Sequence, residues 1–263
     1  AFPKGGLLVF DFTMPKETEG GSYGFQFNEP DGTTEIFTRF AGPAENTTES
    51  VTVAEPGVYP LKVYSDYGFN PDAPFTMKVT LYANAVNATA DKATPVKVPA
   101  LIKSNLVSEK DHNWYALDLT QYPNGGLLTG LLTAPAKMEG GSMGLVLNDT
   151  DKTTRLEGPE WANAASRVAF EYTIKKGAVY YVDVFADGGH NTKDPYTLDL
   201  SWVPNAAHYT ADTAAPIRFP ATVKGWIVSS VDQNWYKLDL ISFSNGAVVT
   251  ATLTTPAKTT GGG

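Results

Sequence analysis

The stretch at residues 111–119 reads Asp-His-Asn-Trp-Tyr-Ala-Leu-Asp-Leu, and it returns at residues 232–240 as Asp-Gln-Asn-Trp-Tyr-Lys-Leu-Asp-Leu. The two copies lie 121 residues apart and keep Asp, Asn, Trp, Tyr, Leu, Asp and Leu in the same places. A match of this length is far beyond chance, so we interpret the chain as a tandem repeat.

Further blocks recur in the same order around each copy. Residues 124–128, 133–137 and 140–145 correspond to residues 5–8, 13–16 and 20–25 near the start, and to 245–249, 254–258 and 261–262 near the end. The repeat length of about 120 residues is the commonest size of a domain. We therefore expect the chain to begin part-way into one repeat, to contain one in full and to stop part-way into a third.

This register predicts three units. Residues 1–90 form a first unit that lacks its first strands, residues 91–211 form a complete second unit, and residues 212–263 supply only the first strands of a third. The connector at residues 87–95 is rich in Ala, Thr and Pro and is echoed at 208–216, so we expect a fixed geometry at the junctions.

The composition favours short strands joined by turns. The chain has 24 Gly, 18 Pro, 13 Tyr and 13 Phe, with many Val and Thr and few helical periods, which is typical of an all-β protein. Strands are expected at residues 6–13, 23–28, 50–53, 58–64 and 75–81, with counterparts at 127–133, 143–148, 167–172, 179–185 and 196–202, and again at 248–254. Pro60 indicates an edge position or a bulge, because proline cannot donate to the ladder.

Charge and composition exclude several classes of function. The net charge is −8 and the pI is near 4.9. A nucleic acid partner is not expected, because the sequence has no basic stretch to contact the phosphates. No apolar run approaches the roughly 18 to 20 residues of a membrane span. The absence of cysteine removes disulfides, thiolate metal sites and cysteine catalysis.

No catalytic constellation is visible. The three histidines, His112, His190 and His208, stand singly, and none has the spacing of a metalloprotease motif. Nucleophile elbows, phosphate loops and dinucleotide fingerprints are missing as well. We therefore predict that the chain is not an enzyme and has no catalytic cofactor.

Trp114 and Tyr115 are the candidate ligand-binding residues, because exposed aromatic side chains bind sugar rings and collagen-like peptides. Strand alternation gives a competing interpretation, in which Trp114 covers a flank while Tyr115, Leu117 and Leu119 belong to the core. Packing is the favoured interpretation, because buried aromatic residues dominate the energetics of cores.

A second candidate site is a loop pattern that recurs at the repeat spacing. Asp66 and Asn70 lie in an Asp-x-Gly-x-Asn sequence, as do Asp187 and Asn191. Their oxygens on a glycine-bent loop are candidate calcium ligands, since calcium takes six to eight oxygens. The same residue types suit a tight turn, which is the favoured interpretation.

Four features follow one another in a fixed order: the Asp-x-Asn-Trp-Tyr-x-Leu-Asp-Leu stretch, an apolar strand after a glycine turn, a Val-Tyr-Tyr-Val strand at residues 179–182 and a Tyr-Thr-Leu strand at 196–198. This order resembles the bacterial pre-peptidase C-terminal domain family, which is similar to the collagen-binding domains of clostridial collagenases. The resemblance implies jelly-roll-like β-sandwich repeats that are non-catalytic, extracellular or on the cell surface, and often appended to a secreted enzyme. The chain departs from the family in showing no attached catalytic domain.

The incomplete ends suggest a function. The third unit carries the strand of Trp235, Tyr236, Leu238 and Leu240, which the first unit lacks, and a sandwich without its edge strands leaves backbone groups unpaired and core uncovered. One hypothesis is that this strand completes another copy of the chain, giving a head-to-tail filament or surface array with a structural or adhesive role. The alternative is a segment of a longer repeat protein, or the collagen- or carbohydrate-binding C-terminal region of a secreted hydrolase, whose partner is an extracellular polysaccharide or protein.

Overall fold

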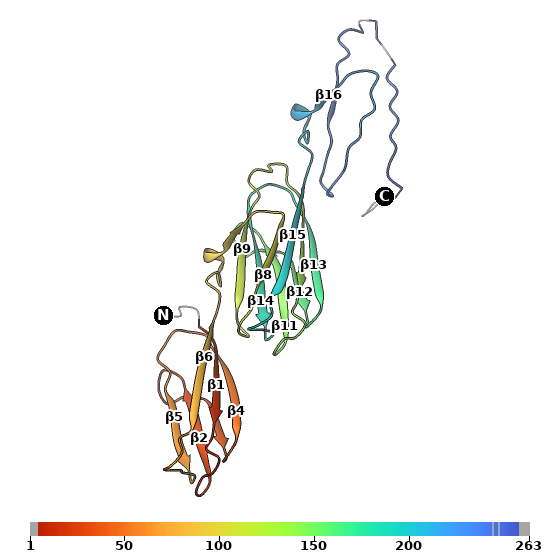
Figure 1. Cartoon of the computed structure of the whole chain (residues 1–263). Coiled ribbons are helices and arrows are strands. Elements are labelled where there is room, and N and C mark those ends of the chain that lie inside the picture. The colour runs from red at the N-terminus through yellow and green to blue at the C-terminus, as the bar shows by residue number, and fades with distance from the viewer. Residues whose placement is uncertain (1–4, 244, 247, 258–263) are drawn as a thin grey trace.

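The computed structural model describes residues 5–243, 245–246 and 248–257, and over these residues the chain is nearly all β (Figure 1). Positions 247, 258 and 261–262 of the repeated blocks lie outside the described residues. The expected β-sandwich class is confirmed.

The N-terminal sheets are two three-stranded antiparallel sheets that face each other. One has the order β4-β1-β6 and the other β3-β2-β5. Their strands are β1 (Gly6–Thr13), β2 (Ser22–Asn28), β3 (Glu35–Ala41), β4 (Asn46–Val53), β5 (Leu61–Asp66) and β6 (Thr76–Ala83). Phe10, Phe12, Phe25 and Phe27 fill the space between the sheets and are almost fully buried. Alternation of apolar residues along β1 and β2 thus supplies the core from both sides.

The central sheets contain the same arrangement with additional strands. Their orders are β13-β10-β15-β8 and β12-β11-β14-β9-β7. The strands are β7 (Thr94–Val96), β8 (Ala100–Ser104), β9 (His112–Asp118), β10 (Gly126–Thr133), β11 (Ser142–Asn148), β12 (Arg155–Ala162), β13 (Arg167–Ile174), β14 (Val179–Asp187) and β15 (Tyr196–Pro204). The short 3-10 helix η1 (Ala90–Lys92) precedes them.

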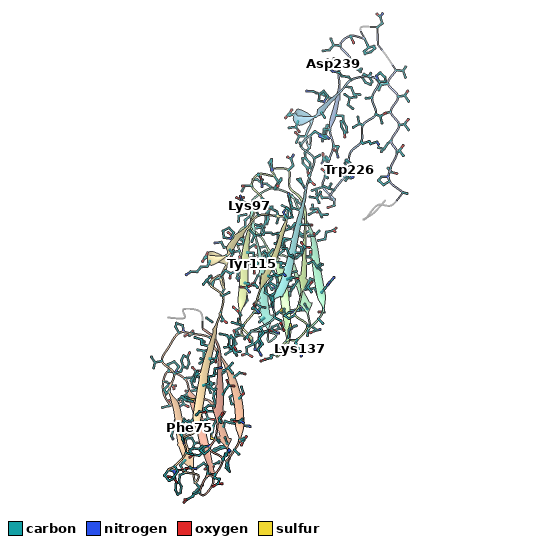
Figure 2. All side chains as sticks on the ribbon, viewed as in Figure 1. Phe75, Lys97, Tyr115, Lys137, Trp226 and Asp239 are labelled. Atoms are coloured by element: carbon teal, nitrogen blue, oxygen red, sulfur yellow. The ribbon has the colours of Figure 1, made fainter. Side chains whose placement is uncertain are left out.

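The C-terminal segment has little regular structure. A 3-10 helix η2 (Ala211–Thr213) leads to β16 (Ala215–Ile217), which pairs in parallel with β17 (Tyr236–Leu238). The strand expected at residues 248–254 is wrong, since these residues have no ladder in the described part of the chain. The counterpart of this segment, β10, is a strand because it lies between β13 and β15, and those pairings have no equivalent here. Figure 2 shows Trp226 and Asp239 on this segment and Tyr115 within the central sheets.

Candidate functional site

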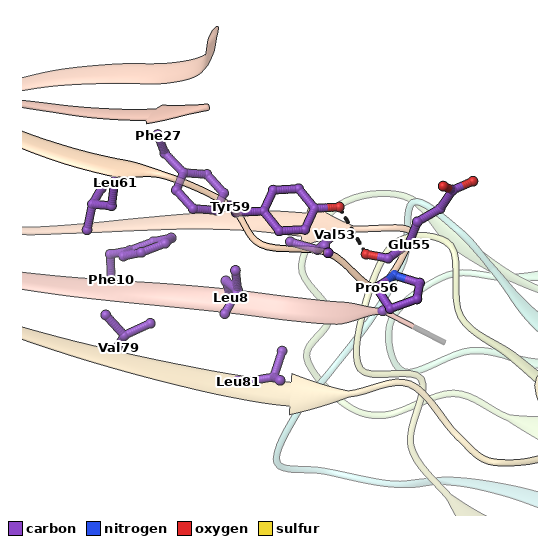
Figure 3. Close-up of a pocket in the computed structure, with 12 residues that line it drawn as sticks. Leu8, Phe10, Phe27, Val53, Glu55, Pro56, Tyr59, Leu61, Val79 and Leu81 are labelled. Carbon is purple, nitrogen blue, oxygen red and sulfur yellow. Dashed lines mark hydrogen bonds between the residues drawn. The ribbon is translucent and has the colours of Figure 1, made fainter. Parts of the chain in front are cut away.

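The N-terminal sheets are open along one side. β5 and β6 are both edge strands, and an apolar groove of about 670 Å³ runs between them (Figure 3). Leu8, Phe10, Val79 and Leu81 form one wall, and Phe27, Tyr59 and Leu61 form the other. We call this feature the open groove. Val79 is exposed in this groove and Leu8, Tyr59, Leu61 and Leu81 are half-buried, whereas Phe10 and Phe27 at its floor are buried.

The central sheets show what covers the equivalent side. There β8 pairs with β15 and β9 pairs with β14. The loop between β8 and β9, β9 itself and the residue that follows β9 carry Leu106, Tyr115, Leu117 and Leu119 into the core, each at most 4% exposed. The effect on the wall is large: Leu200 is fully buried, whereas its counterpart Val79 is 47% exposed. The open groove therefore lies at the position that β8 and β9 occupy in the central sheets.

In the described part of the chain, the C-terminal segment carries the same apolar residues on its surface. Val223, Ile227, Leu238 and Leu240 stand 121 residues after Ile102, Leu106, Leu117 and Leu119, and all four are exposed. Of the predicted assembly strand, Trp235 is exposed and Tyr236 is partly buried, and Tyr236–Leu238 forms β17. We call residues 217–241 the closing segment.

The backbone of β5 is suited to an added strand. Asn28 donates its N–H to the carbonyl of Pro60 at 3.0 Å, so the hydrogen bonds of Pro60 belong to the β2 side. Alternate residues of a strand point their backbone groups in opposite directions, so Leu61 and Val63 turn their N–H and C=O toward the open edge. The edge position expected near Pro60 is confirmed for β5, but Pro60 itself lies one residue before that strand, and its missing donor faces the β2 side and not the open side.

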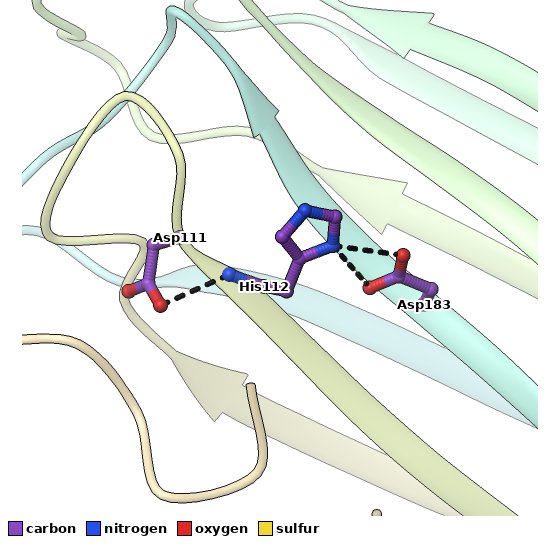
Figure 4. A network of polar contacts seen from close by, with 3 residues as sticks. All are labelled: Asp111, His112 and Asp183. Atoms are coloured by element: carbon purple, nitrogen blue, oxygen red, sulfur yellow. Dashed lines mark hydrogen bonds and ion pairs between the residues drawn. The ribbon is translucent and has the colours of Figure 1, made fainter. Parts of the chain in front are cut away.

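A buried carboxylate joins the central sheets to the residues before them. Asp111 is fully buried, and its side chain accepts the N–H groups of Ala85 (3.3 Å), Val107 (3.0 Å) and His112 (2.9 Å; Figure 4). Burial raises the pKa of Asp111, and the three N–H groups oppose the rise. Ser108 donates to the side-chain oxygen of Asn84 at 2.7 Å. We call this set the aspartate junction.

The aspartate junction recurs 121 residues later. Asp232 accepts the N–H groups of Ala206 (3.1 Å), Val228 (3.0 Å) and Gln233 (2.9 Å), and Ser229 donates to Asn205 at 2.7 Å. The closing segment is therefore held to residues 205–208 as β8 and β9 are held to residues 84–87. Both aspartates stand at the start of the repeated stretch, where the sequence alone does not indicate their role. The signal was the asparagine that precedes each one by 27 residues.

The structure separates the two candidate ligand residues of β9. Tyr115 is 4% exposed and its hydroxyl lies 2.6 Å from that of Tyr196, so it belongs to the core. Trp114 lies on the outer face, and Asn87 bonds both its backbone N–H and its C=O. The alternation favoured for this strand is confirmed, and a ligand role for Trp114 stays a prediction.

Two aromatic pairs on the outer face were not foreseen. Phe40 and Tyr64 meet edge to face with ring centroids 6.3 Å apart, and Trp161 and Phe185 do so at 5.4 Å. Phe40 and Trp161 stand 121 residues apart, as do Tyr64 and Phe185. In each pair one ring lies on a glycine of the neighbouring strand, where a Cβ would come within 2.3 Å of the ring. Phe40 and Trp161 are exposed to solvent.

One ion pair distinguishes the central outer face. His112 Nδ1 lies 3.0 Å from Asp183 Oδ2, and the Asp183 side chain is nearly buried (Figure 4). The hydrogen bond to Asp183 raises the pKa of His112, and burial raises the pKa of Asp183. The equivalent positions, 121 residues away, are Gln233 and Lys62.

The candidate calcium loops serve as turns. The side-chain oxygen of Asn70 accepts the N–H groups of Asp72 and Ala73, and that of Asn191 accepts those of Lys193 and Asp194. Asp66 accepts a hydrogen bond from Ser22 at 3.0 Å, and Asp187 accepts one from Ser142 at 3.5 Å. Among the described residues no three His, Asp or Glu side chains gather as a metal site would require. Calcium binding stays an untested prediction.

No helix within the described residues is long and apolar enough to cross a membrane. No family model and no curated protein matches the chain. Among solved structures, the chain is similar to a CUB1-EGF-CUB2 fragment of human MASP-1/3 (12% identity, 76% of this chain and 90% of that chain, TM-score 0.25). It is also similar to a carbohydrate-binding module of the β-sandwich superfamily (10% identity, 77% and 98%, TM-score 0.25) and to the tandem CBM22 domains of Paenibacillus barcinonensis Xyn10C (8% identity, 78% and 80%, TM-score 0.19). These scores are too low to bear on function.

Proposed function

We propose that the chain is a non-catalytic β-sandwich protein that joins copies of itself, with the closing segment of one copy filling the open groove of another. The observation that carries the proposal is the apolar groove between β5 and β6, which lies where β8 and β9 close the central sheets. An open edge with an uncovered core is a ready template for strand addition.

The closing segment is the occupant that the residues favour. It presents Val223, Ile227, Tyr236, Leu238 and Leu240 in the order in which the central sheets use Ile102, Leu106, Tyr115, Leu117 and Leu119. Full burial of such a side chain contributes about 1.5–3 kcal/mol. The four aliphatic side chains are only 40–67% exposed, so their burial contributes about half of that amount each and reaches the lower part of the association cost of about 4–15 kcal/mol. The added backbone pairing satisfies the β5 and β6 edges in addition.

The geometry of such a joint determines the assembly. The two surfaces belong to different parts of the chain, so the described residues of one copy offer both the open groove and the closing segment. A heterologous contact of this kind does not close on itself without a matching rotation, and it gives a filament or a surface array. We place this assembly outside the cell or on its surface, as the family resemblance in the sequence implies.

The test uses two variants of the full chain that each disable one end. Leu238→Asp with Leu240→Asp removes the closing segment's apolar contacts, and Val79→Asp places a charge in the open groove. We expect the wild-type chain to form polymers at micromolar concentration in light scattering, each variant alone to stay monomeric, and their equimolar mixture to form a dimer with a single joint. Monomeric wild type, or polymers that persist in either variant, would overturn the proposal.

The alternative function, binding of an extracellular polysaccharide or protein, has an observation of its own. Trp161 and Phe40 recur as exposed rings on the outer faces, away from the open groove. Exposed aromatic side chains on a sheet suit the apolar face of a sugar ring or a collagen-like chain. A pull-down of the full chain against collagen, cellulose and chitin separates this function from self-assembly.

A further inference from the structure

The two segments that can cover a sandwich, β9 and the closing segment, differ at one residue of the outer face. The two strands that would receive them, β14 and β5, also differ at one residue of that face. In the central sheets, β9 carries His112 and β14 carries Asp183, and the two side chains form an ion pair at 3.0 Å. In the closing segment the first position is Gln233, and in β5 the second is Lys62. The change from His112 to Gln233 removes a titratable group, and the change from Asp183 to Lys62 reverses the charge.

The register of β9 on β14 shows what Lys62 would meet. Asp183 lies opposite Trp114, and Phe185 lies opposite His112. The same register on β5 sets Lys62 opposite Trp235 and sets Tyr64 opposite Gln233. Lys62 Nζ already lies 4.6 Å from the Tyr64 ring centroid, and Trp235 Nε1 donates to Gln233 Oε1 at 3.0 Å. An ammonium group between two aromatic faces, with an amide beside it, is a favourable cation–π arrangement.

The two mismatched pairings, β9 with β5 and the closing segment with β14, are unfavourable. A strand with histidine, placed on β5, would set an imidazole beside the Lys62 ammonium group. The closing segment, placed on β14, would leave the nearly buried Asp183 carboxylate without its histidine. Specificity arises from such penalties as much as from the matched contacts, because an unpaired buried charge is costly.

We infer that Lys62 and Gln233 are the residues that direct the closing segment to the open groove and keep it from displacing β9 in the central sheets. This inference rests on the proposed function and adds the register of the joint and its specificity. The register pairs Lys62 with Trp235, Leu61 with Tyr236 and Pro60 with Lys237.

The register is tested first, with single cysteines in the full chain, which has none of its own. Pro60→Cys and Lys237→Cys occupy a pair without mutual backbone hydrogen bonds, whose Cα separation of about 4.5 Å suits a disulfide. We expect oxidation of a mixture of these two variants to give a disulfide-linked pair of chains. Pro60→Cys mixed with Asp239→Cys, which is shifted by two residues, is the control. Efficient linkage in the control alone would overturn the register while leaving the association intact.

Specificity is tested by a charge-exchange cycle. We expect Lys62→Asp to weaken association by about fivefold to thirtyfold in sedimentation. Gln233→Lys, which opposes Lys62, should weaken it as well, and the two changes together should restore it. Lys16→Asp makes the same change of charge on an exposed loop and should have little effect. The inference would be overturned if Lys62→Asp weakened association no more than Lys16→Asp does. It would also be overturned if the double variant did not restore association. A wild-type chain that does not associate would refute the proposed function instead.

Discussion

The N-terminal and central sheets form the same kind of sandwich, and they differ in whether strands of the β8 and β9 type cover one side. In the central sheets β8 and β9 close the side, and Leu198 and Leu200 beneath them are fully buried. In the N-terminal sheets the same side is open, and Met77 and Val79 are 37% and 47% exposed. The comparison shows that the phenylalanine core between the two sheets is buried without the cover, whereas the inward-facing residues of the edge strand β6 are not.

The cover strands are tied to what comes before them as well as to the core that they close. Asp111 fixes the start of β9 to residue 85, and Asp232 fixes the closing segment to residue 206 in the same way. The second junction forms even though the closing segment covers no core in the described structure. A segment held in its final shape loses less conformational freedom on binding, which favours association.

The largest expected effect is a difference in stability between variants of Leu117 in the closed central sheets and of its counterpart Leu238 in the closing segment. Leu117 is fully buried, and Leu117→Ala should destabilise the central sheets by about 2–5 kcal/mol through lost burial and a cavity. Leu238→Ala changes the equivalent exposed residue and should alter the free energy of unfolding of the unassembled chain by less than about 0.5 kcal/mol. Denaturant unfolding measures both, at a concentration below that of assembly. Equal losses would mean that Leu238 is already packed within its own chain.

A smaller effect is expected at the aspartate junction. Asp111→Ala leaves three backbone N–H groups without their acceptor, but it also removes the cost of burying the carboxylate. We therefore expect a net loss of about 1–3 kcal/mol. Asp118→Ala is the matched control on the same strand, because that carboxylate is exposed and accepts its hydrogen bonds from Thr120 two residues away. Hydrogen exchange at Ala85 and Val107 should speed up in the first variant alone. Unchanged exchange there would show that the junction does not depend on Asp111.

Much of the fold could be predicted because the pattern is local. β1 and β10 follow from a continuous apolar run after paired glycines, and β2 and β11 follow from alternation. β3 and β12 were missed, since they are short of alternating apolar residues, and β12 is interrupted by Gly158 and Pro159 where its register shifts. Such strands form because β2 and β11 offer an edge, which is a tertiary effect that a sequence pattern does not display.

The candidate site was only half predictable. The repeat spacing identified Leu238 and Leu240 as strand residues that the first unit lacks, but it did not identify the groove that would receive them. Met77 and Val79 look like ordinary strand residues, and only their exposure marks them as part of an open wall. The role of Asp111 could not be predicted for a related reason, because one of its three partners, Ala85, lies 26 residues earlier and a local pattern does not show that contact.

The smallest expected effect sharpens the comparison between His112 and Gln233. The Asp183 hydrogen bond raises the pKa of His112 above 6.5, and Asp183 and Asp111 both favour its charged form. The folded state therefore binds the proton more tightly than the unfolded state. The stabilisation is complete below the unfolded pKa and is lost as the pH rises through the folded one. Burial raises the pKa of Asp183 as well, and that contribution is also lost as the pH rises.

His112→Gln gives the central sheets the residue of the closing segment and removes this dependence. Because 40% of the His112 side chain is exposed, solvent screens the pair, and we expect a loss of about 1 kcal/mol or less. The difference in free energy of unfolding between wild type and variant should be larger near about pH 5.5 than near about pH 8.5. A difference that grows with pH would mean that protonated His112 does not stabilise the central sheets through Asp183. The charge difference between the His112–Asp183 pair and the Gln233–Lys62 pair would then not explain specificity.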